Sequence, residues 1–178
     1  MNYASIRTCD IANGEGVRVS LFVSGCTHHC PGCFNAEAQA FDYGRPFTRE
    51  TEDELLEALG KSWISGLTLL GGEPMEPANQ RGLIGFLRRF RERFGDTRTL
   101  WIYTGCVYER DLLPPAEAPA IEYVTAKRWR TEVTDEILAM TDTLVDGPFI
   151  EALKDISLKF RGSSNQRILE LRKGKALA

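Results

Sequence analysis

The sequence predicts an α/β fold in the form of a partial, open parallel βα barrel. Short apolar runs alternate with amphipathic helical segments, which is the pattern of parallel strands joined by helices. The chain has 178 residues, whereas eight βα units take about 250, so a complete barrel does not fit. A chain of this length buries an ordinary core as one domain, which we expect to span residues 1–178.

Composition and charge narrow the classes of function. Hydrophobic residues make up 43% of the chain and charged residues 26%, as in an ordinary globular protein. The net charge of −3 gives no support to nucleic-acid binding. The first residues lack the basic and apolar regions of a signal peptide, and no apolar run approaches the roughly 18 residues of a membrane span. We expect a cytoplasmic protein that binds neither nucleic acid nor membrane.

The first predicted strand, 17–23, is rich in β-branched and aromatic residues and follows the turn Asn13-Gly14-Glu15-Gly16. The two glycines of that turn do not predict a phosphate-binding loop, because no helical pattern follows them. The other predicted strands are 66–70, 99–103, 121–124 and 143–146.

Three helices are predicted between these strands. Thr48 or Thr51 caps the first, whose acidic first turn complements the helix dipole. The second, 79–94, has apolar residues at helical spacing and arginines elsewhere, which we interpret as a solvated face. Thr134 is expected to cap a third, shorter helix.

A loop with three cysteines follows the first strand. Cys26, Cys30 and Cys33 have the spacing C-x3-C-x2-C, with a Pro31-Gly32 corner between the last two. This corner excludes a regular helix and predicts a turn that lets the thiols converge. Iron–sulfur clusters are held by cysteine thiolates that converge in this way. Three ligands on a [4Fe–4S] cluster would leave one iron open to a ligand that is not protein.

Three other interpretations of this loop remain open from the residues alone. Zinc would take the three thiolates with His28 or His29 as the fourth ligand. Disulfides could pair two of the cysteines, although a chain without a signal peptide is expected to keep its thiols reduced. The thiols could also be free and simply packed, which is how we interpret the separate residues Cys9 and Cys106.

Polar groups follow three of the predicted strands. The glycines of the Gly71-Gly72-Glu73 turn allow close approach of a ligand, and Glu73 could present a carboxylate to an amine. A surface loop is the alternative. Ligands of α/β sheets bind outside the carboxyl ends of the strands, so the cysteine loop, this turn, Thr104 and Asp146 are expected at one rim.

An ordered set of motifs runs through nearly the whole chain. They are Asn2-Tyr3, Asn13-Gly14-x-Gly16, Leu21-Phe22-Val23-Ser24-Gly25-Cys26, Cys30-Pro31-Gly32-Cys33-Phe34-Asn35, Thr104-Gly105, Asp146-Gly147 and Arg161-Gly162-Ser163-Ser164-Asn165-Gln166. Together they resemble the activating proteins of anaerobic (class III) ribonucleoside-triphosphate reductases, which are radical S-adenosylmethionine (SAM) enzymes. The resemblance implies one radical SAM domain, with an insertion near 114–133 and a short C-terminal tail, 168–178.

The resemblance also implies the cofactors and their contacts. A [4Fe–4S] cluster would split SAM with one electron, and the resulting 5′-deoxyadenosyl radical would take a hydrogen atom from a glycine Cα of the reductase. No catalytic side chain is implied, because the cofactors carry the chemistry. The implied metal ligands are Cys26, Cys30 and Cys33. The implied SAM-binding residues are Gly32, Cys33, Phe34, Gly71, Gly72 and Glu73.

The implied partners are the reductase, as protein substrate, and a one-electron donor such as a flavodoxin or ferredoxin. The implied assembly is a homodimer or a complex with the reductase. The Arg161–Gln166 motif has no evident chemical role, and we expect it to shape the rim or meet the reductase. Alternatives are an activase of another glycyl-radical enzyme, of the pyruvate formate-lyase type, and a zinc-binding module without catalysis.

Overall fold

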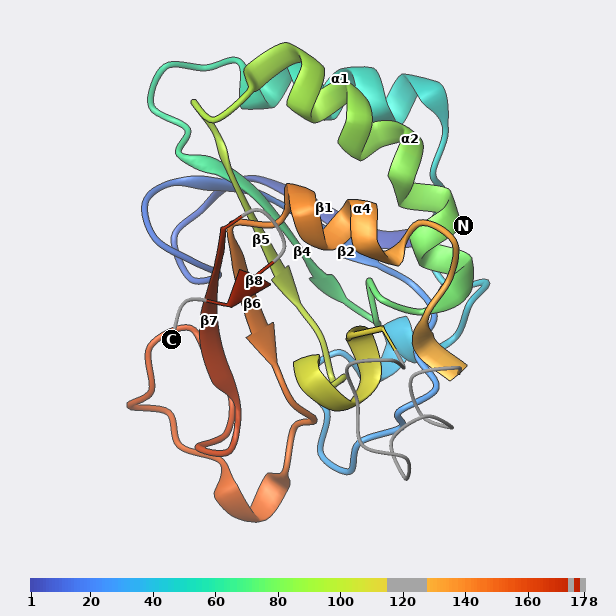
Figure 1. Ribbon diagram of the computed structural model, residues 1–178, viewed down its shortest axis with the longest axis vertical. Coiled ribbons are helices and arrows are strands. Elements are labelled where there is room, and N and C mark those ends of the chain that lie inside the picture. Colours follow the sequence, from blue (N-terminus) through green and yellow to red (C-terminus); the bar gives the residue numbers. More distant parts are fainter. Residues whose placement is uncertain (115–127, 173–174, 177–178) are drawn as a thin grey trace.

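The computed structural model describes residues 1–114, 128–172 and 175–176. The strands are β1 (Asn2–Asp10), β2 (Arg18–Val23), β3 (Arg45–Pro46), β4 (Gly66–Gly71), β5 (Thr99–Tyr103), β6 (Thr143–Asp146), β7 (Arg167–Arg172) and β8 (Lys175–Ala176). The α-helices are α1 (Arg49–Leu59), α2 (Pro77–Phe94) and α4 (Thr134–Met140). Within the described residues the strands form one sheet in the order β3-β1-β2-β4-β5-β6-β7-β8 (Figure 1).

The centre of this sheet is parallel and its edges are antiparallel. β2, β4, β5 and β6 pair in parallel, which confirms four of the predicted strands and the α/β class. β1 pairs antiparallel with β2, and β7 pairs antiparallel with β6, so the sheet is mixed. Neither β1 nor β7 is evident from the sequence, because β1 is mostly half-buried or exposed and all of β7 but its first residue falls in the expected tail.

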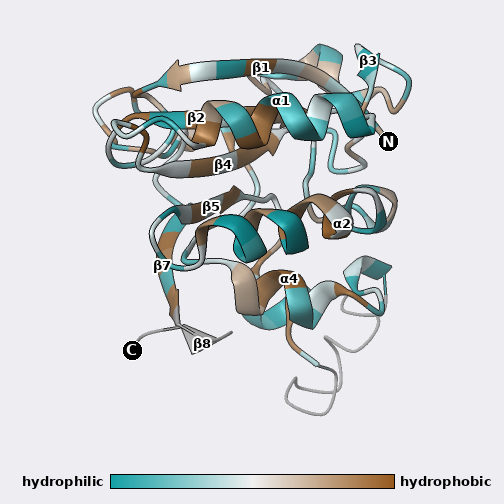
Figure 2. Cartoon of the chain, turned by 90° about the horizontal axis from the view of Figure 1, so that it is seen from above, coloured by the Kyte–Doolittle hydropathy of each residue, from teal (hydrophilic) through white to brown (hydrophobic). Residues whose placement is uncertain are grey.

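The helices α1, α2 and α4 lie along one face of the sheet (Figure 1, Figure 2). α1 begins as predicted, since the Thr48 hydroxyl accepts a hydrogen bond from the Thr51 N–H at 3.4 Å. α2 starts slightly earlier than predicted, at Pro77, whose missing N–H is tolerated in a first turn. The prediction that Thr134 caps α4 is wrong, because Thr134 is inside the helix and its hydroxyl donates to Gln80 Oε1 at 2.6 Å.

The helix-covered face of the sheet is apolar. Side chains at alternate positions of the parallel strands pack against the buried sides of the helices, which is the pattern of a sheet with one face on the core. The strand residues are Val19, Leu21, Leu67, Leu69, Leu100, Ile102 and Leu144, and the helix residues include Leu55, Leu59, Leu83, Phe86, Leu87 and Phe90. Removal of this apolar surface from water supplies most of the stability of the fold.

The opposite, loop-covered face of the sheet contains buried polar residues. Arg18 and Thr68 lie there, and the Thr68 hydroxyl donates to the Asn13 carbonyl oxygen at 2.8 Å. The Phe160 ring packs edge-on against Trp101, with ring centroids 5.4 Å apart. Burial lowers the pKa of Arg18 to about 10, and its guanidinium donates to Thr68 and to main-chain oxygens. The loop segments that contain Asn13 and Phe160 thus cover this face of the sheet, whereas helices cover the other face.

Two expectations fall outside the described residues. The predicted strand 121–124 lies in the segment 115–127, as does most of the expected insertion near 114–133. In the part of the chain that the structure describes, no helix is long and apolar enough to cross a membrane.

Candidate metal and cofactor site

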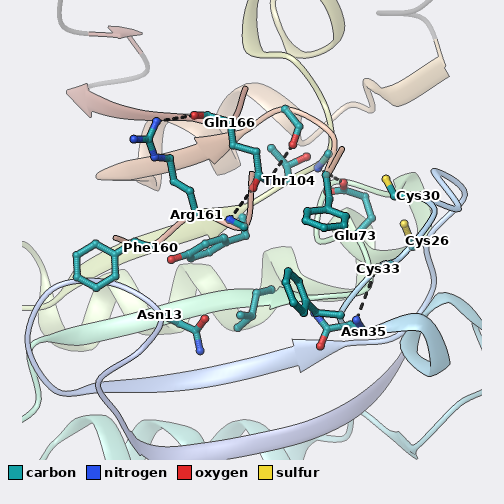
Figure 3. Close-up of a pocket in the computed structure, with 18 of the residues that line it drawn as sticks. Asn13, Cys26, Cys30, Cys33, Asn35, Glu73, Thr104, Phe160, Arg161 and Gln166 are labelled. Carbon is teal, nitrogen blue, oxygen red and sulfur yellow. Dashed lines mark hydrogen bonds between the residues drawn. The ribbon is translucent and has the colours of Figure 1, made fainter. Parts of the chain in front are cut away.

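A pocket of about 460 Å³ opens at the carboxyl ends of the parallel strands. It is lined by the three cysteines of the loop, by Phe34, by the Gly71–Glu73 turn and by Thr104. Asn13 and Arg161 lie on the side of the pocket away from the cysteines (Figure 3). Segments that are distant in the sequence therefore meet at one site, as predicted from their positions after strands.

The three thiols face this pocket and are free. No disulfide joins any cysteine of the chain, all of which lie within the described residues. Two sulfurs bound to one zinc ion at about 2.3 Å each lie at most about 4.6 Å apart. Among the described residues, however, the sulfurs of Cys26, Cys30 and Cys33 are not a group of donor atoms within 4.8 Å of one another, with or without a histidine. At least one pair of these three sulfurs is therefore more than 4.8 Å apart in this structure.

Burial controls the protonation of these thiols. It raises the pKa of Cys26 to about 12 and also raises the pKa of Cys30, so both groups are neutral thiols in the protein without metal. Iron binds the thiolate, so loading of the site releases protons. Cys33 Sγ accepts a hydrogen bond from the Asn35 N–H at 3.4 Å, a contact of the kind that tunes cluster sulfurs.

The start of α2 holds the cysteine loop in place. Asn79 is buried, and its Nδ2 donates to the carbonyl oxygens of Ser24 and Glu73 at 3.0 and 2.9 Å. The Glu76 carboxylate accepts from the Thr27 N–H at 2.7 Å and from the Thr27 hydroxyl at 2.5 Å. The loop conformation is therefore fixed by the protein's own hydrogen bonds.

The glycines of the Gly71-Gly72-Glu73 turn bring the end of β4 against the cysteine loop. Gly71 has φ +106°, and a Cβ at this position would lie 2.7 Å from the Val23 oxygen. A Cβ on Gly72 would lie 2.7 Å from the Gly25 oxygen. The Gly72 and Glu73 amides donate to those same oxygens at 2.7 and 2.9 Å. The two glycines therefore allow the main chain of this turn to pack closely against the start of the cysteine loop.

Glu73 is completely buried, and both of its oxygens accept hydrogen bonds from the protein. Oε1 accepts from the Met75 N–H at 2.8 Å, and Oε2 accepts from the Gly105 N–H at 2.7 Å. Oε2 also lies 3.0 Å from His28 Nε2. Glu73 therefore ties the cysteine loop to the loop after β5. A carboxylate has about four acceptor positions, so a ligand amine would join these contacts.

The two histidines of the loop differ in their surroundings. The His28 ring stacks on Trp129 with centroids 4.4 Å apart, and its Nε2 lies 3.8 Å from Cys106 Sγ. His29 is exposed and contacts Gln39 through Nδ1 at 3.1 Å. Burial raises the pKa of Cys106, which supports the interpretation of a packed thiol.

Phe34 forms an exposed edge of the pocket, with 63% of its surface accessible. Its ring lies 5.1 Å from that of Phe149, and the Lys154 ammonium lies 4.8 Å from its centroid. Gly32 does not line the pocket. It has φ +67°, a left-handed backbone conformation that favours glycine at this place in the turn.

The expectation that Asp146 faces the rim is wrong. Its carboxylate is buried and accepts hydrogen bonds from the Tyr108 N–H at 2.8 Å and from Arg167 Nε at 2.9 Å. A carboxylate beside a strand-end arginine is satisfied by an ion pair within the protein. The next residue, Gly147, lines the pocket instead.

The Arg161–Gln166 motif is a turn locked by its own side chains. Gln166 Oε1 accepts from the Gly162 N–H at 2.9 Å, and Gln166 Nε2 donates to the Gly147 carbonyl oxygen at 3.1 Å. Arg161 Nη1 donates to the Gln166 carbonyl oxygen at 2.9 Å. The motif forms part of the pocket wall, which is one of the two roles expected of it.

Comparison with known proteins agrees with this site. Residues 12–169 match the family model described as 4Fe-4S single cluster domain. The chain is 36% identical over 174 residues to the anaerobic ribonucleoside-triphosphate reductase-activating protein of Escherichia coli (strain K12), an alignment that covers 97% of this chain and 100% of that protein. This chain belongs to the family of anaerobic ribonucleoside-triphosphate reductase-activating proteins.

Two further members of the family are similar over nearly their whole length. The activating protein of Pasteurella multocida (strain Pm70) is 38% identical over 170 residues, which cover 94% of this chain and 96% of that protein. The activating protein of Enterobacteria phage T4 is 36% identical over 168 residues, which cover 94% of this chain and 93% of that protein. Cysteine thiolates are the groups that hold iron–sulfur clusters, and three free thiols line the pocket of this member.

Three residues that hold the cysteine loop are not identified from the sequence. They are Thr27, Glu76 and Asn79. A signal exists for Asn79, because it lies one turn before Leu83 on the buried side of α2, where an unpaired amide would be costly. No comparable signal exists for Thr27 and Glu76, since both are ordinary loop or helix-start residues and their contact joins segments far apart in the chain.

Proposed function

We propose that this member of the family activates an anaerobic ribonucleoside-triphosphate reductase by radical chemistry at a [4Fe–4S] cluster. The observation that carries the proposal is the set of three free thiols on one side of a pocket of about 460 Å³. Three protein ligands leave the fourth iron of such a cluster open. A pocket of this volume is in the range of small-molecule sites, and we propose SAM as the molecule that it takes.

The cluster and SAM together would supply one electron and a carbon-centred radical, which takes a hydrogen atom from a glycine Cα of the reductase and leaves methionine, 5′-deoxyadenosine and a glycyl radical. The protein's part is to hold and orient these groups. The proposed iron ligands are Cys26, Cys30 and Cys33. The proposed SAM-binding residues are Cys33, Phe34, Gly71, Gly72 and Glu73, with Gly32 shaping the turn between the last two cysteines.

Glu73 has a positioning part in this proposal as well as a binding part. Its hydrogen bonds to Met75 and Gly105 and its contact with His28 keep the carboxylate at the base of the pocket. A ligand amine that reached Glu73 would therefore meet a preorganised acceptor, which costs less ordering on binding. No side chain is proposed as a general acid or base, because hydrogen-atom transfer to a carbon radical needs none.

The fold and the partners follow from the same proposal. The mixed sheet with its helices on one face would be a partial barrel of radical SAM type, with antiparallel strands added on both sides of its parallel centre. A flavodoxin or ferredoxin would supply the electron in a cytoplasmic setting. The reductase would dock over the open side of the pocket, as a complex with one or two copies of the activating protein.

Anaerobic activation of the reductase tests this function. The protein is reconstituted with iron and sulfide, reduced with dithionite, and mixed with SAM and the reductase of the same organism. We expect a glycyl-radical signal by electron paramagnetic resonance and formation of 5′-deoxyadenosine, both dependent on SAM. Pyruvate formate-lyase serves as the control target and should gain no radical. A loaded protein that produces no radical on the reductase, or produces it on pyruvate formate-lyase instead, overturns the proposal.

A further inference from the structure

The guanidinium group of Arg161 lines the pocket with most of its donors unused. Nη1 donates to the Gln166 carbonyl oxygen at 2.9 Å. Among the described residues, Nε and Nη2 have no acceptor, and Nε is buried. Arg161 also forms no ion pair with a described carboxylate. Buried N–H groups without an acceptor are rare in folded proteins, so this edge of the guanidinium is a candidate binding group.

Two other arginines on this side of the sheet, Arg167 and Arg18, do not share this property. Arg167 forms ion pairs with Glu109 and Asp146. Arg18, on the same face of the sheet, donates through all three nitrogens, to the Thr68 hydroxyl and to the carbonyl oxygens of Glu15 and Leu67. The protein thus satisfies these two arginines with its own oxygens, whereas Arg7, which also lines the pocket, is exposed and lies over the Phe22 ring. At Arg161 it leaves free the edge that carries Nε and Nη2, which presents two parallel donors to an oxygen ligand.

The turn that carries Arg161 is built to keep it in the pocket. Gln166 binds the Gly162 amide and the Gly147 carbonyl oxygen, so the motif is braced against the turn that follows β6. The adjacent Phe160 packs on Trp101. These contacts hold Arg161 in place on the side of the pocket opposite Cys26, Cys30 and Cys33 (Figure 3).

The rim of the same pocket is apolar and exposed. Ile156 and Phe34 both line the pocket, with 94% and 63% of their surfaces accessible. Exposed apolar side chains grouped around a cavity are typical of surfaces that meet another protein. The proposed function requires that a main-chain glycine of the reductase pass this rim and enter the pocket.

We infer that the free edge of Arg161 binds a main-chain carbonyl oxygen of the reductase segment that carries the glycine. This inference rests on the proposed function and gives the Arg161–Gln166 motif a role in recognition of the protein substrate. A main-chain oxygen is the acceptor that a glycine segment always offers, because glycine has no side chain to recognise. Arg161 is a binding residue here and takes no part in the radical transfer.

The test measures two affinities separately. The dissociation constant of the loaded protein with unactivated reductase is determined anaerobically by sedimentation velocity. The SAM concentration that half-saturates 5′-deoxyadenosine formation is determined without reductase.

Arg161→Lys keeps the charge and a donor for Gln166 but removes the two-donor edge. Arg81→Lys is the matched control, because Arg81 pairs with Glu132 at the surface and does not line the pocket. Iron content and circular dichroism confirm folding, and Arg161→Gln serves as a second variant.

We expect Arg161→Lys to weaken reductase binding by roughly tenfold or more, the loss typical of a hydrogen bond to a charged group. Arg81→Lys should change the dissociation constant for the reductase by less than about twofold. In both variants the half-saturating SAM concentration should stay near that of the unchanged protein. Unchanged reductase affinity in folded Arg161→Lys and Arg161→Gln overturns the inference. A rise in the half-saturating SAM concentration with unchanged reductase affinity also overturns it and assigns Arg161 to SAM. A protein that shows neither cluster nor SAM cleavage before substitution contradicts the proposed function instead.

Discussion

The two faces of the sheet are built by different rules. The helix-covered face is closed by apolar side chains at regular spacing, such as Leu21 and Leu69 against Leu87. The loop-covered face has Arg18 and Thr68 beneath irregular segments, and it leaves a pocket where those segments meet the strand ends. The helix-covered face stabilises the fold through buried area, whereas the loop-covered face positions thiols and polar groups through individual hydrogen bonds. Damage to the two faces should therefore have different consequences.

The largest expected effect is at the cysteine loop. Cys30→Ala should abolish assembly of the [4Fe–4S] cluster and with it all SAM cleavage, because two remaining ligands do not hold the cube. The unfolding midpoint of the metal-free protein should hardly change. Iron and sulfide analysis after reconstitution measures the first effect, and thermal unfolding measures the second. Cys9→Ala is the control, since Cys9 is exposed and lies outside the pocket. Full iron content in Cys30→Ala would contradict the assignment of this ligand.

The helix-covered face should respond in the opposite way. Leu87 is fully buried in the core, and Leu87→Ala should lower the free energy of unfolding by about 2–5 kcal/mol through lost burial and a residual cavity. At low temperature the variant should still assemble its cluster. Urea unfolding and iron analysis check the two parts. If a folded Leu87→Ala protein failed to assemble its cluster, packing of the helix-covered face would be needed for cluster assembly, and the prediction would be wrong.

A third substitution lies at the junction of the two faces. Asn79→Leu keeps the size of the side chain but removes the amide donor from the carbonyl oxygens of Ser24 and Glu73, of which the Glu73 oxygen still accepts from the Glu76 N–H. The expected loss of stability is about 1–3 kcal/mol, the usual cost of buried groups left unpaired. Iron content should fall as well, because the loop loses its anchor. Unchanged stability with full iron content would show that Asn79 does not position the loop.

The difference between the two faces also explains which parts of the fold and of the site can be predicted from the sequence. The parallel strands and the helices follow from apolar periodicity, because each must bury one side against the core. The cysteines are evident because their spacing and the Pro31-Gly32 corner are local. The contacts of Glu73 with Gly105 and of Glu76 with Thr27 are not evident, since they depend on how distant loops meet. The orientation of Asp146 is mispredicted for the same reason, as Arg167 comes from a strand that the pattern does not reveal.

The smallest expected effect is on the outer surface of α2. The Arg88 guanidinium lowers the pKa of Glu136 from its usual value of 4.5, through an exposed ion pair. A depressed carboxyl pKa adds stability that is present above about pH 4.5 and is lost as the pH falls below it. Arg88→Gln should therefore cause a small loss of stability at pH 7 that disappears in acid. Urea unfolding at pH 7 and at pH 3 measures the difference in the free energy of unfolding between the variant and the unchanged protein. A difference that is larger at pH 3 than at pH 7 would contradict this prediction.

We propose that the thiols of the loop-covered face hold a cluster with one iron open to SAM. The most direct measurement is the electron paramagnetic resonance spectrum of the reduced, reconstituted protein with and without SAM, together with its iron and sulfide content. We expect four irons and four sulfides per chain and a spectrum that SAM alters, because an open iron would gain a ligand. A colourless protein with one zinc ion, or a cluster whose spectrum is indifferent to SAM, would contradict it.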